Sequence, residues 1–261
     1  EAGLAFAFNE LFHFQLEPLK LVGISQRAEN DFVGVQCGIM DQLINIFGKQ
    51  KQVLKLDCRT LEHEYFPFEQ EKLRIVLCDS QVQRALASSE YNLRRSQCEE
   101  GVRLIRENNP VVNSLRDVTC DMLTEFKNHL DPVLYKRCKY VVQENERVLE
   151  ACNSLNNGDV SNFGEKMNAS HNGLRDEYEV SCTELDHLVD GALELDGVFG
   201  SRMMGAGFGG CTINLVSLDH LEDFTEGMEK VYRDKLKKSS KIYITSIEEG
   251  TSLINVKAVH V

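Results

Sequence analysis

The chain has 261 residues, of which 42% are hydrophobic and 27% charged, and its formal net charge is −12. This length can hold one large domain or two small ones with sizeable cores. The acidic balance argues against nucleic acid or an anionic membrane surface as the main partner, because both are negatively charged. No apolar stretch approaches the ~20 residues that a membrane span requires.

Nine cysteines are scattered along the chain, and no two of them form a CxxC pair. An odd number of cysteines without metal-ligand spacing is typical of reduced thiols in a cytoplasmic protein. We therefore expect no zinc site and assign no metal ligand.

The first third of the chain changes from a helical to an alternating pattern. It predicts helices over 1–14, 17–30 and 39–47, then strands over 52–57, 62–66 and 73–78. Glu17-Pro18 separates the first two helices, because proline lacks the N–H that a helix interior needs. Glu1 stands inside a helical pattern with no starting methionine and no cap, so we expect residues upstream of it.

Helical patterns dominate the rest of the chain. We expect helices over 85–107, 132–155, 159–172, 182–195 and 219–236, and strands over 198–204, 211–216, 241–246 and 252–256. Strands mixed with segregated helices predict the α+β class. A domain boundary is expected near 67–72, where Pro67 and a charged run interrupt the pattern.

Asp41 is the first candidate for chemistry. It lies in CGIMDQ, residues 37–42, at an expected helix start beside Gly38. A helix N-terminus stabilises negative charge, so Asp41 should be ionised at neutral pH. The alternative is a first-turn carboxylate with no chemical role, since acidic residues favour this position.

A second polar segment, residues 84–95, follows a buried strand. A strand, a polar turn and a helix in this order often place polar side chains at the mouth of a cleft. Ser88, Ser89 and Tyr91 are candidates for binding hydroxyl groups, and Arg84 for pairing with a carboxylate. The favoured interpretation of Arg94, Arg95, Glu99 and Glu100 is a solvated helix face.

His171 lies in a polar segment, residues 170–181, that is expected to separate two helices. An imidazole can act as an acid or base near neutral pH, yet the sequence offers His171 no partner. A structural histidine is the favoured interpretation.

The sequence SRMMGAGFGGC, residues 201–211, holds four glycines in six residues: Gly205, Gly207, Gly209 and Gly210. Clustered glycines can present main-chain N–H groups to a phosphate. The segment lacks the Lys-Ser/Thr ending of a P-loop, and it leads into a strand rather than a helix. A tight turn between two strands is an equally open interpretation.

The motifs CGIMDQ (37–42), RALASSEYNLRRSQCEE (84–100), LRDEYEVSCTELD (174–186) and SRMMGAGFGGC (201–211) occur in this order. Together they resemble the GHMP small-molecule kinase family, named for its galactose, homoserine, mevalonate and phosphomevalonate members. The glycines alone indicate the wider family, whereas GIMDQ and LASSEY resemble its galactokinase branch. The likeness covers essentially the whole chain.

This resemblance implies that ATP and Mg²⁺ are used to phosphorylate the C1 hydroxyl of α-D-galactose, giving galactose 1-phosphate. It implies that Asp41 is the catalytic aspartate, acting as a base or as an electrostatic anchor. It also implies that Cys37 and Gly38 line the sugar pocket and that Tyr91 lies beside the sugar. The glycine loop then neighbours the nucleotide phosphates, while the main ATP and Mg²⁺ motifs are expected upstream of Glu1.

Three departures from the family pattern qualify this assignment. Gln83 stands where some members have an arginine beside the aspartate, so Arg84 is only a candidate electrostatic partner. Met204 stands where threonine is common. The family's first sugar motif and its phosphate-binding second motif do not occur in the sequence. We therefore expect this segment alone neither to bind ATP tightly nor to turn over.

The resemblance further implies a GHMP kinase fold of the α+β class, with the active site between two domains. Residues 1–70 would be the remainder of a ribosomal-S5-like N-terminal domain, and residues 71–261 a ferredoxin-like C-terminal domain with added helices. Three alternatives stay open: a galactokinase-like sugar sensor, a kinase for a related sugar such as N-acetylgalactosamine, and an α+β interaction module. The oligomeric state is left open.

Overall fold

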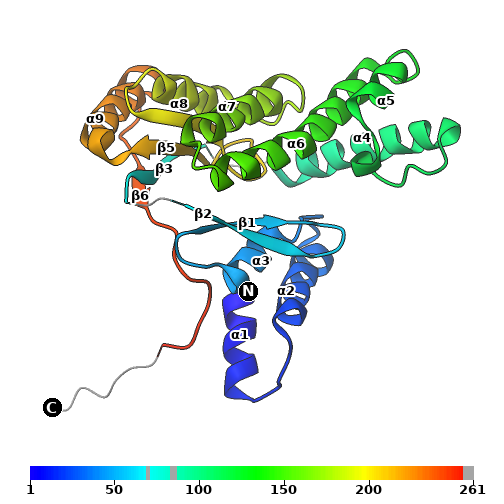
Figure 1. Cartoon of the computed structure of the whole chain (residues 1–261), viewed down its shortest axis with the longest axis horizontal. Coiled ribbons are helices and arrows are strands. Elements are labelled where there is room, and N and C mark those ends of the chain that lie inside the picture. The colour runs from blue at the N-terminus through cyan, green and yellow to red at the C-terminus, as the bar shows by residue number, and fades with distance from the viewer. Residues whose placement is uncertain (69–70, 83–86, 255–261) are drawn as a thin grey trace. The chain divides into compact units, whose positions relative to one another are not determined.

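The computed structural model describes residues 1–68, 71–82 and 87–254 (Figure 1). The chain divides into two compact units, one formed by Glu1–Phe68 together with the segment that starts at Ile247, the other by Glu69–Ser246. The proposed assignment of 1–70 and 71–261 to the two family domains stays a prediction. None of the described helices is both long and apolar enough to cross a membrane.

The described residues of the first unit form three α-helices and one β-hairpin. They are α1 (Ala2–Leu11), α2 (Pro18–Arg27), α3 (Met40–Phe47), β1 (Gln52–Leu56) and β2 (His63–Pro67), with a π-helical turn at Ala28–Val33. Glu17 has extended backbone angles and Pro18 starts α2, which confirms the predicted break. Val22, Ile39 and Leu43 form a small core on which Leu54 and Leu56 of β1 pack.

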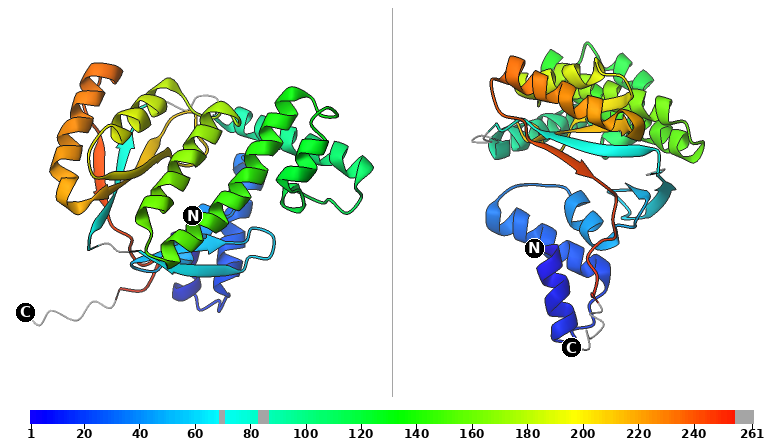
Figure 2. Two further views of the ribbon diagram at one scale, coloured as in Figure 1. Left: turned by 45° about the horizontal axis from the view of Figure 1, so that its top comes forward. Right: turned by 90° about the vertical axis from the view of Figure 1, so that its left-hand side faces the viewer.

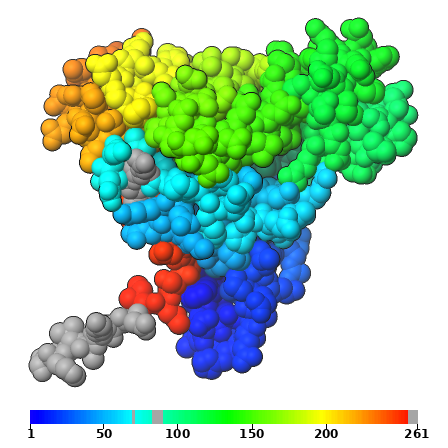
Figure 3. Space-filling view, in the orientation of Figure 1, coloured from blue at the N-terminus to red at the C-terminus, as the bar shows by residue number. Residues whose placement is uncertain are grey.

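The C-terminal segment lies beside α1 in the first unit, as the red segment beside dark blue shows in Figure 3. The main-chain N–H groups of Gly250 and Thr251 donate hydrogen bonds to the carbonyl oxygens of Gly48 and Asn45, at 2.9 and 2.6 Å. The predicted strand 252–256 is wrong over Ser252–Ile254, which form no strand, and its other residues lie outside the described part. This segment is joined to α3 instead of to a sheet.

The second unit is built on a four-stranded antiparallel sheet. Its strands β3 (Leu73–Asp79), β4 (Val198–Met203), β5 (Cys211–Ser217) and β6 (Ile242–Thr245) lie in the order β4-β5-β3-β6. Helices separate β3 from β4 and β5 from β6, so the succession is β-α-β-β-α-β. This succession and strand order are those of a ferredoxin-like fold.

Helices cover one face of this sheet (Figure 2). The helices of the unit are α4 (Ala87–Asn108), α5 (Cys120–Glu125), α6 (Pro132–Asn156), α7 (Val160–Asp176), α8 (Thr183–Leu193) and α9 (Leu221–Val231). Short helical turns at Leu115–Asp117, Leu218–His220 and Tyr232–Leu236 complete it. Val76, Val216, Phe224 and Met228 are fully buried between sheet and helices, where each large apolar side chain contributes about 1.5–3 kcal/mol.

The longest discrepancy in helix boundaries concerns α7. The sequence predicts an end near residue 172, but the helix continues to Asp176. A close approach of backbones fixes this helix on β4, because a Cβ on Gly164 would lie 2.0 Å from the carbonyl oxygen of Phe199. The polar segment that separates α7 from α8 is therefore shorter than predicted and begins after Asp176. This turn contacts the glycine loop, as described below.

Candidate active site

Asp41 lies in the first turn of α3 and is exposed to solvent. The helix begins after Ile39 without a side-chain cap, so its first N–H groups keep their positive potential beside the carboxylate. Leu43 is 1% exposed, and the packing of its side chain in the core holds the helix in place. The sequence thus places one carboxylate on a rigid element with its side chain outward.

Asp41 also lines an open cavity of about 570 Å³ in the first unit. The other lining residues are Ile44, Asn45, Gly48, Lys49, Gln52 and the segment 247–251. Glu248 and Glu249 contribute further carboxylates there, while Lys49 contributes an ammonium group. The lining thus carries three carboxylates and one ammonium group, which makes it unsuited to a phosphate.

Cys37 and Gly38 lie on the loop that precedes α3. The Cys37 thiol donates to the side-chain amide oxygen of Asn30 at 3.4 Å and accepts from the side-chain amide nitrogen of Gln42 at 3.9 Å. Burial, followed by the charge of Glu29, raises the pKa of this thiol, so Cys37 is not a thiolate nucleophile at neutral pH. No atom of the described residues lies within 4 Å of a Cβ placed on Gly38, so packing does not require this glycine.

The glycine loop joins β4 to β5 in the second unit. Gly205, Gly207, Gly209 and Gly210 all have positive φ, between 73° and 128°, and Phe208 has a φ of 57°. Gly207 and Gly209 are also sterically required, because a Cβ would lie 2.1 Å from the Val180 carbonyl oxygen and 2.9 Å from that of Val82. Gly205 faces open space instead.

Main-chain hydrogen bonds attach the glycine loop on two sides. Phe208 donates its N–H to the carbonyl oxygen of Val180 at 2.8 Å, and Ser80 donates to the carbonyl oxygen of Gly210 at 2.8 Å. The Ser80 side is fixed further by Lys238, whose ammonium donates to the Ser80 carbonyl oxygen at 2.9 Å. The loop is therefore a turn between β4 and β5 that main-chain hydrogen bonds hold on two sides.

Tyr91 lies half-buried in α4. Burial, followed by the neighbouring Cys98, raises the pKa of Tyr178, and Tyr91 is near enough to add a smaller contribution. Arg84 and Gln83 lie outside the described residues, as do the side chains of Ser88 and Ser89. The candidates thus fall into two groups: Cys37, Gly38 and Asp41 belong to the first unit, while Tyr91 and the glycines belong to the second.

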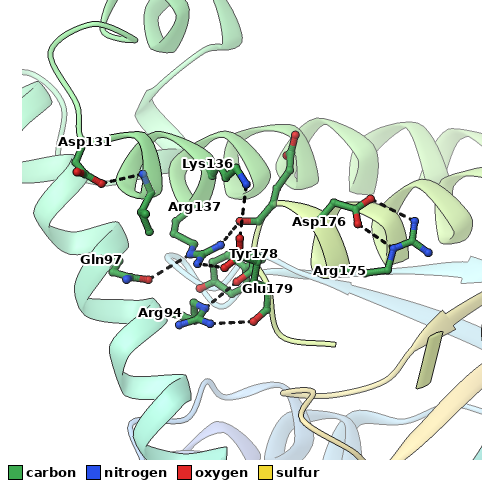
Figure 4. A network of polar contacts seen from close by, with 11 residues as sticks. Arg94, Gln97, Asp131, Lys136, Arg137, Arg175, Asp176, Tyr178 and Glu179 are labelled. Carbon is green, nitrogen blue, oxygen red and sulfur yellow. Dashed lines mark hydrogen bonds and ion pairs between the residues drawn. The ribbon is translucent and has the colours of Figure 1, made fainter. Parts of the chain in front are cut away.

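Two buried arginines at the turn after α7 were not recognised in the sequence. Arg94 was assigned to a solvated face, and this is wrong, since it is 8% exposed. It donates to the carbonyl oxygens of Tyr178 and Glu179, while Arg137, 3% exposed, donates to Glu177 and Glu179 (Figure 4). Three of these acceptors are main-chain carbonyl oxygens and one is the Glu179 carboxylate, all some 40 to 85 residues away, which no local pattern reveals.

His171 is fully buried, in agreement with its interpretation as a structural histidine. Its Nδ1 accepts a hydrogen bond at 3.3 Å from the main-chain N–H of Met203, the last residue of β4. Its Nε2 lies 3.5 Å from a carboxylate oxygen of Asp186, which in turn accepts a 2.5 Å hydrogen bond from Ser181. Through Asp186 and His171, Ser181 of the turn after α7 is therefore connected to Met203, just before the glycine loop.

Comparison with known proteins identifies the class. The model of the GHMP kinases N terminal domain matches residues 1–49, and that of the GHMP kinases C terminal domain matches residues 148–234. The chain belongs to the GHMP kinase family. Within this family it is 40% identical over 254 residues to a galactokinase of Roseiflexus sp. (strain RS-1), and 43% identical over 248 residues to one of Clostridium acetobutylicum.

A solved structure gives the same result. The galactokinase of Lactococcus lactis, complexed with galactose, is 35% identical to the chain and matches 96% of it with a TM-score of 0.91. These matches cover 97% and 95% of the chain for the two curated relatives, but only 65% and 64% of those relatives, and 64% of the Lactococcus lactis chain. The chain thus spans a little less than two thirds of the proteins that it resembles.

Proposed function

We propose that the protein is a galactokinase, which transfers the terminal phosphoryl group of ATP to the C1 hydroxyl of α-D-galactose. The similarity to the galactose-bound Lactococcus lactis enzyme, at a TM-score of 0.91, carries this proposal. Asp41 supports it from the residues themselves, because an exposed carboxylate on a fixed helix end suits a group that contacts a sugar hydroxyl.

In this proposal Asp41 orients the C1 hydroxyl and either accepts its proton or holds it electrostatically. Phosphoryl transfer needs little covalent help from the protein, so positioning and charge stabilisation supply most of the rate. Cys37 and Gly38 would line the sugar pocket, and Tyr91 would contact the sugar. Because its thiol stays protonated, Cys37 would act as a neutral neighbour of the sugar.

ATP and Mg²⁺ are the cofactors of the proposed reaction. The glycine loop fits the neighbourhood of a phosphate, because Gly205 leaves open space at a main-chain segment held rigidly on either side. We assign no Mg²⁺ ligand, since no group of three His, Cys, Asp or Glu side chains among the described residues is arranged to hold a metal ion. A cytoplasmic location is part of the proposal.

The test is galactose-dependent ADP formation by the protein expressed from its complete reading frame. Wild type should convert galactose and ATP to galactose 1-phosphate and ADP, whereas Asp41→Asn should lower kcat by about 10²-fold or more. The KM for ATP should change much less, because Asp41 is assigned to the sugar. The matched control is Asp31→Asn, an exposed carboxylate in the preceding turn. A wild-type protein that binds galactose without forming ADP would favour the sugar-sensor alternative, and turnover only with N-acetylgalactosamine would favour the related-sugar kinase.

A further inference from the structure

The shape of the glycine loop depends on one neighbouring turn, residues 177–181. The Val180 carbonyl oxygen of this turn accepts the N–H of Phe208 at 2.8 Å. The same oxygen would lie only 2.1 Å from a Cβ placed on Gly207, so no side chain fits there. A shift of a few tenths of an ångström in the turn must therefore move the loop, or open the contact.

The turn is held in part by its own main chain, because the N–H groups of Tyr178 and Val180 donate to the carbonyl oxygens of Gly173 and Leu174 at the end of α7. Glu179 has a φ of 55°, in the left-handed region that non-glycine residues rarely adopt. In this conformation the carbonyl groups of residues 177–179 point to neighbouring helices instead of continuing α7. Arginine side chains from α4 and α6 donate hydrogen bonds to these carbonyl groups.

Arg94 supplies two of these bonds from α4. Its Nε donates to the Tyr178 carbonyl oxygen at 2.7 Å and its Nη2 to that of Glu179 at 2.9 Å. Glu90, one turn earlier on the helix, orients the guanidinium through Nη1 at 3.3 Å. Arg137 of α6 holds the other side of the turn, donating through Nη2 to the Glu179 carboxylate at 2.6 Å (Figure 4).

Arg94 also lies beside the glycine loop. Its guanidinium carbon lies 6.0 Å from the centre of the Phe208 ring, within the range of a cation–π contact. Arg94 follows Tyr91 by three residues, so both lie on the same face of α4. One guanidinium thus joins the helix that carries the proposed sugar contact to the loop proposed to lie beside the phosphates.

We propose that Arg94 is a positioning residue for the nucleotide: it fixes the glycine loop through the turn 177–181, without touching ATP itself. This inference rests on the proposed galactokinase function. If Arg94 were purely structural, its substitution would lower the stability of the unit and leave the kinetic constants of the folded enzyme unchanged. If Arg94 is a positioning residue, its substitution changes the KM for ATP but not the KM for galactose.

The kinetic test uses Arg94→Met and Arg94→Lys in the protein expressed from its complete reading frame, at a temperature where circular dichroism shows each variant folded. Arg94→Met should raise the KM for ATP about tenfold, the factor that corresponds to loss of one charged hydrogen bond. Arg94→Lys keeps the charge but not the two-pronged geometry of the guanidinium, so its KM for ATP should lie between those of wild type and Arg94→Met. The KM for galactose should change by less than about twofold, because Cys98 and Val102 keep α4 packed against its neighbours.

Arg95→Met is the matched control, since Arg95 is the next residue, carries the same charge and is half exposed, beside Glu99. Its KM for ATP should equal that of wild type. An unchanged KM for ATP in both Arg94 variants would overturn the proposal, as would an equal rise in both Michaelis constants.

Hydrogen exchange separates this inference from the proposed function. Peptides covering residues 203–211 should exchange about tenfold faster in Arg94→Met than in Arg95→Met, whether or not the protein phosphorylates galactose. Unchanged exchange there, with the loss of protection confined to α4, would contradict the positioning role. A wild-type protein without kinase activity but with the expected exchange difference would overturn the proposed function and its nucleotide role, while confirming the mechanical link.

Discussion

Gly250 and Asn45 meet main chain to main chain: a Cβ on Gly250 would lie 2.7 Å from the Asn45 carbonyl oxygen. Thr251, the next residue, donates its N–H to the same oxygen at 2.6 Å. The C-terminal segment is thereby attached to α3, the helix whose first turn carries Asp41. The position of the proposed catalytic carboxylate thus depends on residues some 200 positions later in the chain.

Gly250→Ala should disturb this attachment. The added methyl group must displace the main chain of α3 or of the C-terminal segment, at a cost of about 1–3 kcal/mol in the free energy of unfolding. Because α3 is short, its displacement moves Asp41, so kcat for galactose should fall more than the KM for ATP rises. Urea unfolding and steady-state kinetics measure the two effects.

The control for this substitution is Gly23→Ala. Gly23 lies within α2 and has no atom of the described residues within 4 Å of its Cβ position. Alanine there should leave turnover unchanged and stabilise the protein by up to about 1 kcal/mol, because it favours the helix. Wild-type kcat in Gly250→Ala would show that the C-terminal attachment does not position Asp41.

Two glycines of the loop allow steric contact to be separated from backbone strain. Gly205 and Gly207 both have positive φ, 73° and 85°, but only the Cβ of residue 207 would collide with Val180. Alanine costs about 1–2 kcal/mol in the left-handed region at either site. Gly207→Ala should therefore be the more destabilising in urea unfolding and should raise the KM for ATP further. Equal effects of the two substitutions would mean that the contact with Val180 is unimportant.

The sequence was most informative where a signal is local. The spacing of apolar residues predicted the helices and all four strands of the larger sheet, and Pro18 marked the start of α2 as expected. Clustered glycines indicated the loop, and the first-turn position of Asp41 was read from the residues before it. These features depend on neighbours in the chain, which the sequence displays directly.

Interactions between distant residues were not predictable. Arg94 has the spacing of a surface residue on a polar helix, and only the arrival of the Tyr178 and Glu179 carbonyl groups makes it a buried one. The segment Ser252–Ile254 has a β-like composition but no strand to pair with. In both cases tertiary contacts override the local preference.

The Glu179 carboxylate should make the turn sensitive to acid. The hydrogen bond from Arg137 holds its pKa below the usual 4.5, so its contribution to stability is present above that value and is lost as pH falls through the lowered pKa. Because the side chain is 48% exposed, we expect about 1 kcal/mol or less. Glu179→Gln should be less stable than wild type in urea at pH 7, and the difference should shrink as the pH falls below 4.5. A difference that does not shrink with falling pH would assign the effect to packing.

His171 should stabilise the fold mainly as a hydrogen-bond acceptor. Its Nδ1 accepts the N–H of Met203, and its Nε2 faces the Asp186 carboxylate. His171→Leu leaves a buried N–H and a carboxylate without this partner, which should cost about 1–3 kcal/mol in urea unfolding. His171→Asn places an amide oxygen near the Nδ1 position and should recover part of that loss. If His171→Asn is no more stable than His171→Leu, the hydrogen bond to Met203 is not what retains the histidine, and packing of the ring between α7 and β4 is its main contribution.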